Sequence, residues 1–360
     1  MKNTLLVSTR KGLLILERKN NTWQVIRDAF EGIPVSLSFV DDRTGTWWAG
    51  LDHGHWGIKL HRSDDRGLNW IEVEAPKYPD GAVIKEGQPA SLKYIWAFAH
   101  GSEKQPGRLY IGTEPGGLFY SDDDGASFDL VNGLWNHPSR ESQWMGGGRD
   151  NAGIHSIIVD PKDQNHIFVG ISVAGVFETR DGGQSWIAKN RGLRADYLPD
   201  PDAEIGHDPH LLVAHPENID ILWQQNHCGI FRSTDGGSNW NDISDPNGPA
   251  GFGFAIAIDE RSEERAWVVP GVSDEIRIAV DKALCVCRTD DGGKTWKAFR
   301  KGLPQSHCYD IVYRHALVAQ GDDLLFGTTT GNLFHSHDGG ESWSPVSHHF
   351  PMVYALYLTD

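Results

Sequence analysis

The chain has 360 residues and a formal net charge of −16 at pH 7. Nucleic acid and anionic membrane surfaces repel such a protein, which excludes both as its main partner. The first apolar run, residues 4–7, is followed at once by Ser-Thr-Arg-Lys and is too short for a signal peptide or a membrane helix. The four cysteines show neither disulfide nor zinc spacing, and with the missing signal they predict a protein of the reducing cytoplasm.

The first expected strands cover residues 4–9, 12–19 and 22–26. From residue 63 onward one short pattern, (S/T)-x-D-x-G-x-(S/T/N)-(W/F), recurs along the chain. Its aromatic residue returns every 47 to 58 residues, which is the size of one four-stranded propeller blade with its loops. The copies occupy residues 63–70, 121–128, 179–186, 233–240, 289–296 and 336–343.

Each copy stands where one expected strand turns into the next. The Asp side chain can accept backbone N–H bonds across such a turn, and the Gly supplies the positive φ that a tight loop requires. The Trp or Phe then opens the following strand and is expected to pack between blades. We therefore expect the Asp carboxylates of the pattern to be structural and to bind their own turn.

A seventh blade is expected to join the two ends of the chain. The three N-terminal strands lack an innermost partner, and residues 353–358 resemble the expected innermost strands at 35–41, 154–160 and 254–259. The sequence thus predicts an all-β fold, a seven-bladed β-propeller whose first blade is closed by the C-terminal strand, which leaves no exposed sheet edge. The even repeat and the lack of a linker predict one domain over residues 1–360.

The six turns resemble the BNR or Asp-box repeat of sialidase-like propellers, a group that includes xyloglucanase-type glycosidases, the sortilin luminal domain and a photosystem II assembly factor. Four segments are also similar to those of single-domain bacterial BNR-repeat proteins labelled as glycosyl hydrolases: 133–140, 144–148, 152–157 and 224–233. The resemblance implies a propeller and, as an expectation, glycoside hydrolysis. The same repeat serves hydrolases and pure binding proteins, so the resemblance alone leaves the function open.

A classical sialidase is not expected. The F/Y-R-I-P motif, which in that family gives the first arginine of a carboxylate-binding triad, has only Glu31-Gly32-Ile33-Pro34 as a counterpart, with Gly32 where Arg is required. The Tyr and Glu nucleophile pair has no counterpart either. The xyloglucanase type uses two propellers with a cleft between them, whereas this chain is expected to form one.

Polar residues gather in the loops that lead into the innermost strands and in those between second and third strands. In a propeller these loops share one face, where ligands bind. The expected face carries Arg10, Lys11, His53, His55, Trp56, Glu114, Trp135, Asn136, His137, Arg140, Trp144, Arg149, Asp150, Asp196, Tyr197, Glu204, His207, Asp208, Asn226, His227, Asp274, Glu275, Arg277, His307 and Tyr309.

Three histidines are the first candidates for chemistry. Aligning residues 154–161 with 209–216 puts His155 and His210 at the same position of adjacent innermost strands, with His227 expected nearby. Three imidazoles can hold a divalent metal, Zn²⁺, Mn²⁺ or Fe²⁺. They can also act as general acid and base, with Tyr197, Asp208 or Asp150 as partner. The structural alternative is that they bond loop carbonyls.

The aromatic and cationic loop residues indicate a saccharide. Trp56, Trp135 and Trp144 can stack on sugar rings. Cationic side chains can pair with a carboxylate or sulfate. The expected cations are Arg10, Lys11, Arg140, Arg149 and Arg277, and the further substrate contacts are His53, His55, His137 and Asn226. The alternative is that each Trp packs between blades and each Arg pairs with a loop carboxylate.

Two functions follow from these residues. The first is a carbohydrate-active enzyme, hydrolase or lyase, for a small acidic saccharide. The second is a non-catalytic propeller that binds a peptide or partner protein. Many titratable residues lie on loops longer than a scaffold requires, which favours the enzyme.

Overall fold

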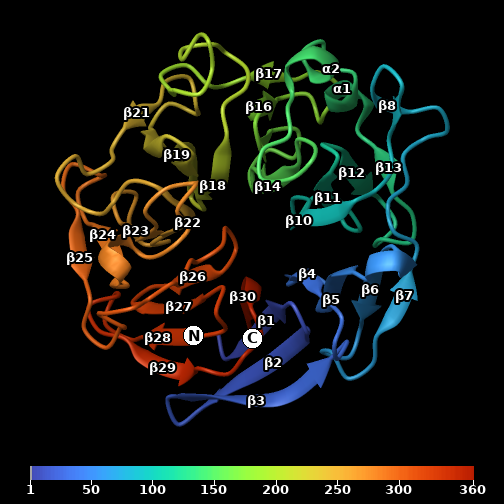
Figure 1. Ribbon diagram of the computed structural model, residues 1–360. Coiled ribbons are helices and arrows are strands. Elements are labelled where there is room, and N and C mark those ends of the chain that lie inside the picture. The colour runs from blue at the N-terminus through green and yellow to red at the C-terminus, as the bar shows by residue number, and fades with distance from the viewer. Residues whose placement is uncertain (1) are drawn as a thin grey trace. The chain divides into compact units, whose positions relative to one another are not determined.

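The structure, a computed structural model, describes residues 2–360. Within this range the chain forms seven four-stranded antiparallel sheets and one two-stranded hairpin (Figure 1). These sheets are the blades of a seven-bladed β-propeller, which confirms the predicted fold. No helix of the described residues is long and apolar enough to cross a membrane.

The chain divides into two compact units, each with its own hydrophobic core. Unit 1 comprises Met1–Ser38, Val213–Gly236 and Asn241–Asp360, and unit 2 comprises Phe39–Leu212 and Gly237–Trp240. Two of the four unit boundaries lie within strands, β4 (Val35–Asp41) and β18 (Pro209–His215), and the other two lie on either side of Gly237–Trp240.

Unit 1 contains the first, sixth and seventh blades and the outer strands of the fifth. Its core includes the fully buried Leu5, Trp267, Phe326 and Phe334. Its elements are β1 (Thr4–Thr9), β2 (Gly12–Lys19), β3 (Thr22–Ala29), β19 (Asn218–Asn226), β20 (Gly229–Ser233), β21 (Asn241–Asp242), β22 (Gly253–Ile258), β23 (Ala266–Pro270), η2 (Val280–Lys282), β24 (Val286–Thr289), β25 (Lys297–Phe299), β26 (Leu317–Gln320), β27 (Asp323–Gly327), β28 (Leu333–Ser336), β29 (Ser344–Ser347) and β30 (Val353–Thr359).

Unit 2 contains the third and fourth blades and the outer strands of the second. Ile154, Val169 and Phe177 are fully buried in its core. Its elements are β5 (Thr46–Asp52), η1 (Gly54–Trp56), β6 (Ile58–Ser63), β7 (Ile71–Val73), β8 (Val83–Lys85), β9 (Gln88–Pro89), β10 (Tyr94–His100), β11 (Leu109–Glu114), β12 (Leu118–Ser121), β13 (Asp129–Leu130), α1 (Asn132–Trp135), α2 (Arg140–Gln143), β14 (Ile154–Val159), β15 (Ile167–Ile171), β16 (Gly175–Thr179) and β17 (Ile187–Ala188).

The repeated Asp turns have the predicted hydrogen bonds. In the turn after β16, Asp181 accepts bonds from the Thr179 hydroxyl at 2.7 Å, the Ser185 backbone N–H at 2.9 Å and the Ser185 hydroxyl at 2.5 Å. These donors lower the pKa of Asp181 to about 2, and Gly182 and Gly183 have positive φ. The same bonds recur at Asp123, Asp291 and Asp338. At Asp65 the side-chain amide of Asn69 donates in place of the second hydroxyl.

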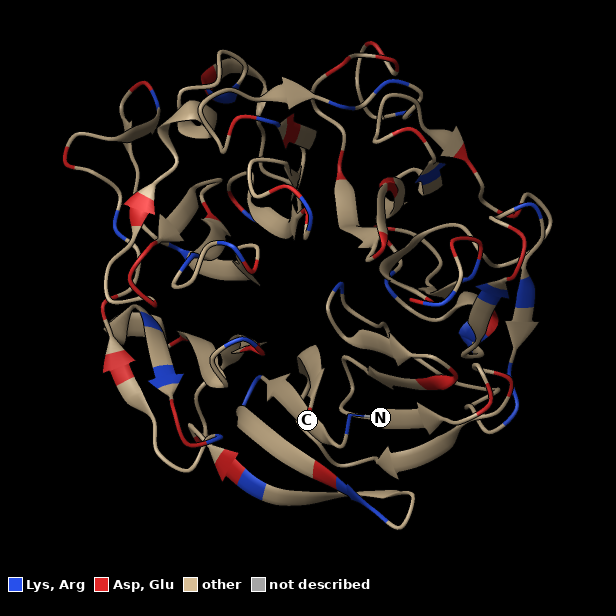
Figure 2. Cartoon of the chain, turned by 180° about the vertical axis from the view of Figure 1, so that it is seen from behind, with Lys and Arg blue, Asp and Glu red and all other residues tan. Residues whose placement is uncertain are grey.

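The aromatic residues of the turns also join successive blades. The Trp240 indole N–H donates to the carbonyl of Lys189 at 2.7 Å, and that of Trp296 donates to the carbonyl of Ile243 at 2.7 Å. Acidic residues occur in segments of every blade rather than on one surface (Figure 2). Part of the negative charge of the chain is therefore the carboxylates of structural turns.

The first blade combines both ends of the chain as predicted. Its strand order is β3-β2-β1-β30, and β1 pairs with β30 from Thr4 opposite Thr359 to Thr9 opposite Val353. Without β30, the backbone groups of β1 that face it would form an open sheet edge.

A buried ionic cluster joins the first blade to the seventh. Arg18 donates to the Asp323 carboxylate at 3.1 Å, and the imidazoles of His335 and His337 lie 3.1 Å and 2.9 Å from that carboxylate. Burial, with the neighbouring His337 as a second cause, lowers the pKa of His335 to about 4. The folded protein therefore holds His335 neutral at pH 7.

We predict that deletion of residues 353–360 abolishes cooperative unfolding. The deletion removes the buried side chains of Val353 and Leu356, each worth about 1.5–3 kcal/mol, together with the hydrogen bonds to β1. Thermal denaturation followed by circular dichroism measures the effect, with deletion of Asp360 alone as the control. An unchanged cooperative transition in the longer deletion would contradict this account of the first blade.

We also predict a pH-dependent loss of stability that depends on His335. Its pKa in the folded state, about 4, lies below its ordinary value of about 6.5, so the unfolded chain binds more protons between these values. Stability therefore falls as the pH drops through this window, by about 1–2 kcal/mol between pH 7 and pH 5. Urea denaturation should show a smaller fall for His335→Gln than for wild type or for the exposed-site control His349→Gln. Equal falls in all three proteins would rule out His335 as the cause.

Candidate functional site

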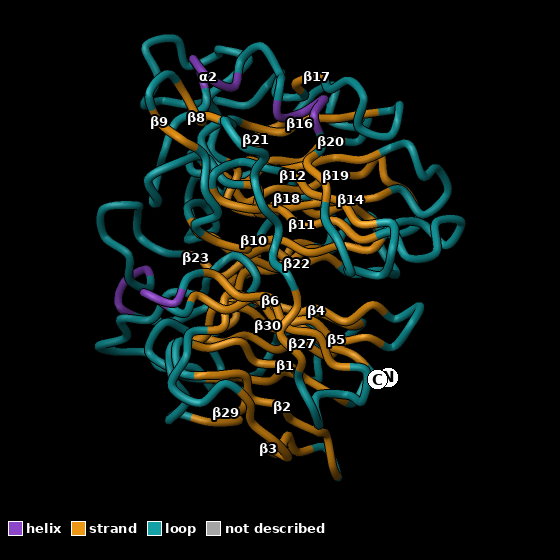
Figure 3. Tube along the Cα trace, turned by 90° about the vertical axis from the view of Figure 1, so that its right-hand side faces the viewer, coloured by secondary structure: helices purple, strands orange, loops and turns teal. Residues whose placement is uncertain are grey.

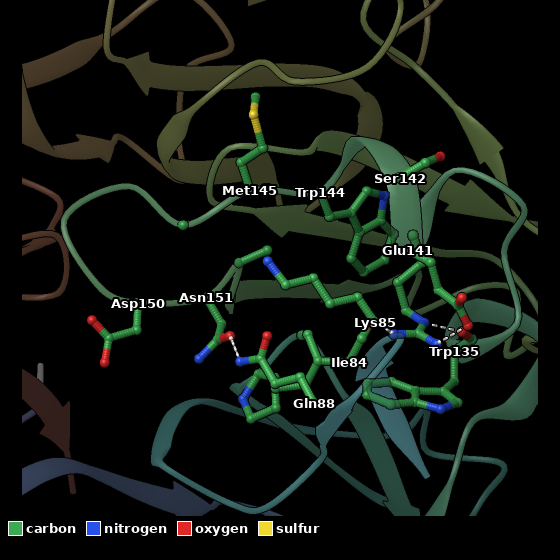
Figure 4. Close-up of a pocket in the computed structure, with 15 residues that line it drawn as sticks. Ile84, Lys85, Gln88, Trp135, Glu141, Ser142, Trp144, Met145, Asp150 and Asn151 are labelled. Carbon is green, nitrogen blue, oxygen red and sulfur yellow. Dashed lines mark hydrogen bonds and ion pairs between the residues drawn. The ribbon is translucent and has the colours of Figure 1, made fainter.

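Unit 2 contains a pocket of about 400 Å³ between the β8–β9 hairpin, the loop after β11 and the segment that leads from β13 to β14 (Figure 4). In Figure 3, β8, β9 and α2 lie together at one side of the molecule. The pocket is lined by Ile84, Lys85, Gln88, Pro115, Gly116, Trp135, Arg140, Glu141, Ser142, Trp144, Met145, Gly146, Asp150, Asn151 and Ala152. Four of these, Trp135, Arg140, Trp144 and Asp150, are among the predicted site residues.

Arg140 holds one wall of the pocket together. Its guanidinium stacks on the Trp135 ring at 4.0 Å and donates to the carbonyls of Trp135 and of Ile84, the latter at 2.6 Å. A third contact reaches the Glu141 carboxylate at 3.1 Å. Burial lowers the pKa of Arg140 from its ordinary value, and Glu141 opposes this shift. The N–H groups of Arg140 thus bind protein groups rather than a substrate, as the structural alternative in the sequence analysis predicts.

Trp144 supplies the aromatic surface. Its indole N–H donates to the Ser139 hydroxyl at 3.0 Å, and its ring contacts Phe177 with 5.3 Å between centroids. A Cβ at Gly116 would lie 3.1 Å from the indole, so glycine there leaves room for the ring. Trp144 is half-buried and Trp135 is only 6% exposed, which leaves Trp144 as the better surface for a sugar ring.

A buried carboxylate fixes the end of the segment that carries Asp150. Glu114, at the end of β11, forms an ion pair with Arg149 and accepts a bond from the Asn151 backbone N–H at 3.3 Å. The Arg149 guanidinium also lies over the Tyr94 ring at 4.2 Å. Asp150 stands between these two anchored residues. Arg149 is therefore held by protein groups rather than presented to a substrate.

Two carboxylates stand at opposite ends of the pocket lining, and that of Asp150 is turned away from the other labelled residues in Figure 4. In the view of Figure 4, Asp150 lies at one end and Glu141 at the other, with Lys85 and Trp144 between them. Both acids are exposed. Glu141 is paired with Arg140, whereas the Asp150 carboxylate has no hydrogen bond or ion pair within residues 2–360. Carboxylates that flank a bound sugar are the groups that most glycosidases use as acid, base or nucleophile.

The pocket lining includes residues that the sequence did not predict as site residues, among them Lys85, Gln88, Glu141 and Asn151. Gln88 donates to the Asn151 side chain at 3.2 Å, which ties the β8–β9 hairpin to the segment that carries Asp150. One signal for this hairpin was available, because the connection from Val73 to Tyr94 is longer than a blade requires. The contacts themselves join residues far apart in the chain and leave no pattern in it.

Other predicted residues of unit 2 are buried or engaged away from the pocket. His155 is fully buried, with an edge contact to Trp96 at 5.8 Å and a bond to Ser156 at 2.9 Å. His210 is 2% exposed and lies 3.6 Å from the Asp208 carboxylate. The Tyr197 hydroxyl donates to the carbonyl of Gly206 at 2.9 Å. Their burial and bonds favour structural roles, and their catalytic roles stay predictions.

Histidines in two loops of unit 2 lie against aromatic rings. His137 packs on Phe177 at 5.1 Å, and burial lowers its pKa. His53 and His55 precede Trp56 on the loop after β5, and their ring centroids lie 5.2 Å and 6.5 Å from that of the Trp56 ring. Trp56 is 71% exposed. The loop after β5 contributes no residue to the pocket lining, and His137 itself is not a lining residue, although other residues of its segment are.

The remaining predicted residues lie in unit 1. Arg10 and Lys11 are exposed in the turn between β1 and β2. Asn226 is buried and donates to the Gln224 side chain at 3.0 Å. His227 lies 3.5 Å from the Asp274 carboxylate, and the Arg277 guanidinium lies 5.5 Å from the centre of the Phe254 ring.

The predicted metal site draws on both units, with His155 and His210 in unit 2 and His227 in unit 1. The three-histidine site for Zn²⁺, Mn²⁺ or Fe²⁺ therefore stays a prediction. A second group of possible ligands, Asp323, His335 and His337, lies within unit 1. There Arg18 already supplies a positive charge to the Asp323 carboxylate, so a metal ion would have to displace it.

Comparisons with known proteins agree with the Asp turns and the fold. The BNR/Asp-box repeat family model matches residues 334–345. An oligoxyloglucan-reducing end-specific xyloglucanase of Emericella nidulans is 24% identical over 243 residues, which cover 66% of this chain and 25% of that protein. The xyloglucanase Xgh74A of Acetivibrio thermocellus is 24% identical over 320 residues, 79% of this chain and 36% of that protein. The chain thus spans about a quarter to a third of these relatives.

Solved structures show the same fold. An ancestral GH74 enzyme superposes with a TM-score of 0.56 at 17% identity, covering 84% of this chain and 36% of that one. YCF48 bound to the D1 peptide superposes with a TM-score of 0.54 at 14% identity, covering 86% of this chain and 80% of that one. The chain is a seven-bladed, Asp-box-repeat β-propeller that is similar to xyloglucanases over part of their length.

Proposed function

We propose that this chain is a glycoside hydrolase-like propeller that binds a saccharide in the unit 2 pocket and cleaves it with Asp150 and Glu141. The observation that carries the proposal is the pocket itself, in which an indole surface lies between two exposed carboxylates. The similarity to xyloglucanases supports a glycosidic bond as the target. The sequence-based expectation of an enzyme is retained, with Asp150 as the one predicted catalytic residue that lines the pocket.

The pocket favours a neutral or weakly charged saccharide. Its lining contains two cations, Lys85 and Arg140, and two carboxylates, Glu141 and Asp150. The N–H groups of Arg140 donate to protein carbonyls and to Glu141. Lys85 is therefore the lining cation that can bind an anionic group of a substrate. The expected preference for an acidic saccharide therefore receives little support from this pocket.

Catalysis would divide between the two carboxylates. Glycosidases of the common type need one carboxylic acid to protonate the leaving oxygen and one carboxylate to act on the opposite side as base or nucleophile. Asp150 and Glu141 come from opposite ends of the pocket lining, and we assign these two roles to them. The Trp144 ring between them would hold the sugar by stacking.

A peptide-binding function is the second candidate. Trp56 favours it, because an exposed indole is an anchor that protein partners commonly use. YCF48, a propeller of the same fold, was solved with a bound D1 peptide.

We predict that Asp150→Asn and Glu141→Gln each lower kcat by about 10²- to 10⁴-fold, since each replacement keeps the side chain's shape and removes its titratable group. The assay is release of reducing ends from xyloglucan oligosaccharides, followed by chromatography. Asp196→Asn is the control, because Asp196 is an exposed carboxylate outside the pocket. Activity of both variants at the wild-type level, or no cleavage of any glycan by wild type, would refute the proposal.

We predict a second effect on turnover from Glu114, which acts on Asp150 through its neighbours. Glu114→Gln removes the charge that holds Arg149 and weakens the bond to Asn151, so Asp150 is less well placed. We expect kcat to fall about tenfold or more while KM changes little, because the Trp144 surface is untouched. Glu86→Gln, an exposed change, is the control. A lower Tm with wild-type kcat would show that Glu114 is structural and does not position Asp150.

A further inference from the structure

Unit 1 carries a row of aromatic rings on neighbouring innermost strands. Phe252 and Phe254, at the start of β22, are 5.3 Å apart between centroids, and Phe254 is 6.1 Å from Tyr313, which precedes β26. Tyr313 in turn stacks on Tyr354 of β30 at 6.4 Å with an angle of 17° between the rings. Phe254 is buried, whereas the other three rings are half-buried. The innermost strands of three blades thus form one partly exposed aromatic surface.

Two guanidinium groups lie on this surface. Arg277 is 5.5 Å and Arg314 is 5.4 Å from the centre of the same Phe254 ring. Guanidinium groups beside an aromatic ring are groups that can bind an anion such as a carboxylate. Within residues 2–360 Arg277 makes no ion pair, and its one hydrogen bond is donated to the carbonyl of Asp274 at 2.9 Å.

The loop that carries Arg277 is an extension peculiar to the sixth blade. Residues 271–285 join β23 to β24, whereas the same connection takes two to five residues in the other blades. The loop is ordered by its own backbone, with Gly271 bridged to Ala279 and the Val272 N–H donating to the carbonyl of Ile278 at 3.0 Å. At its tip Asp274 lies 3.5 Å from His227. A blade does not need this loop for its fold, and its effect is to place Arg277 on Phe254.

We propose that this surface, formed by Phe252, Phe254, Tyr313, Tyr354, Arg277 and Arg314, is a second saccharide site that binds a uronic acid residue. The sugar ring would pack on the half-buried aromatic rings, and its carboxylate would lie between Arg277 and Arg314, because guanidinium groups bind carboxylates through charged, directional hydrogen bonds. The proposal goes beyond the proposed hydrolase function. It requires no bond cleavage and lies in unit 1, whereas the pocket lies in unit 2.

The test is isothermal titration of the purified full chain with trigalacturonate and, as a probe matched in shape without the charge, its methyl ester. We expect wild type to bind trigalacturonate and to bind the ester about tenfold or more weakly. Arg277→Gln should lose affinity for trigalacturonate by a similar factor and leave the affinity for the ester unchanged, with Arg277→Lys in between. Arg277 is exposed on a loop, so these variants should keep the wild-type Tm.

The pocket variant Trp144→Ala separates the two sites. It should bind trigalacturonate like wild type, whereas Arg277→Gln should keep the wild-type rate of xyloglucan oligosaccharide cleavage. No saturable binding of trigalacturonate, equal binding of the ester, or loss of trigalacturonate binding in Trp144→Ala would overturn the second site. Tighter binding of a triglutamate peptide than of trigalacturonate would overturn its assignment to a saccharide.

Discussion

The carboxylate of the Asp turn is the interaction on which the blades depend. At Asp181, Asp291 and Asp338 the carboxylate accepts a hydrogen bond from the hydroxyl of the residue two positions before it. It also accepts one from the backbone N–H and one from the hydroxyl of the residue four positions after it. These bonds fix the turn between the third and fourth strands without help from the rest of the protein. Connections elsewhere in the blade are then free to lengthen, as the segment from β13 to β14 and the loop from β23 to β24 do. Both candidate sites are built on such long connections.

The turns and the closure of the first blade could be predicted because their signals are local or repeated. A turn at Asp181 needs only the eight residues around it, and the pairing of β30 with β1 follows from a strand-like segment that has no other partner. Trp135, Arg140, Trp144 and Asp150 were found as pocket residues because unusual polar and aromatic residues stood in a long loop. Glu141 stood in the same loop and was overlooked.

Side-chain burial could not be predicted in the same way. His155 and His210 start innermost strands as expected, and both are buried together with the residues next to them. The roles of Arg140 and Arg149 also escaped the sequence. Arg140 donates to the carbonyls of Trp135 and Ile84, and Arg149 pairs with the carboxylate of Glu114. Ile84 and Glu114 belong to distant segments of the chain, which only the fold brings near.

The two sites differ in charge. The sequence predicted catalytic groups and cations for an acidic saccharide in one site, whereas the structure divides them between two. The lining of the unit 2 pocket contains two cations and two carboxylates, whereas two guanidinium groups lie beside one aromatic ring of the unit 1 surface.

The most direct test of the central claim is a crystal structure of the Asp150→Asn variant grown with a xyloglucan oligosaccharide. If Asp150 and Glu141 are the catalytic pair, a sugar ring stacks on Trp144 and its glycosidic oxygen lies between residue 150 and Glu141. An empty pocket beside a saccharide bound elsewhere, or a sugar that contacts neither residue, would contradict the assignment of this pocket as the catalytic site.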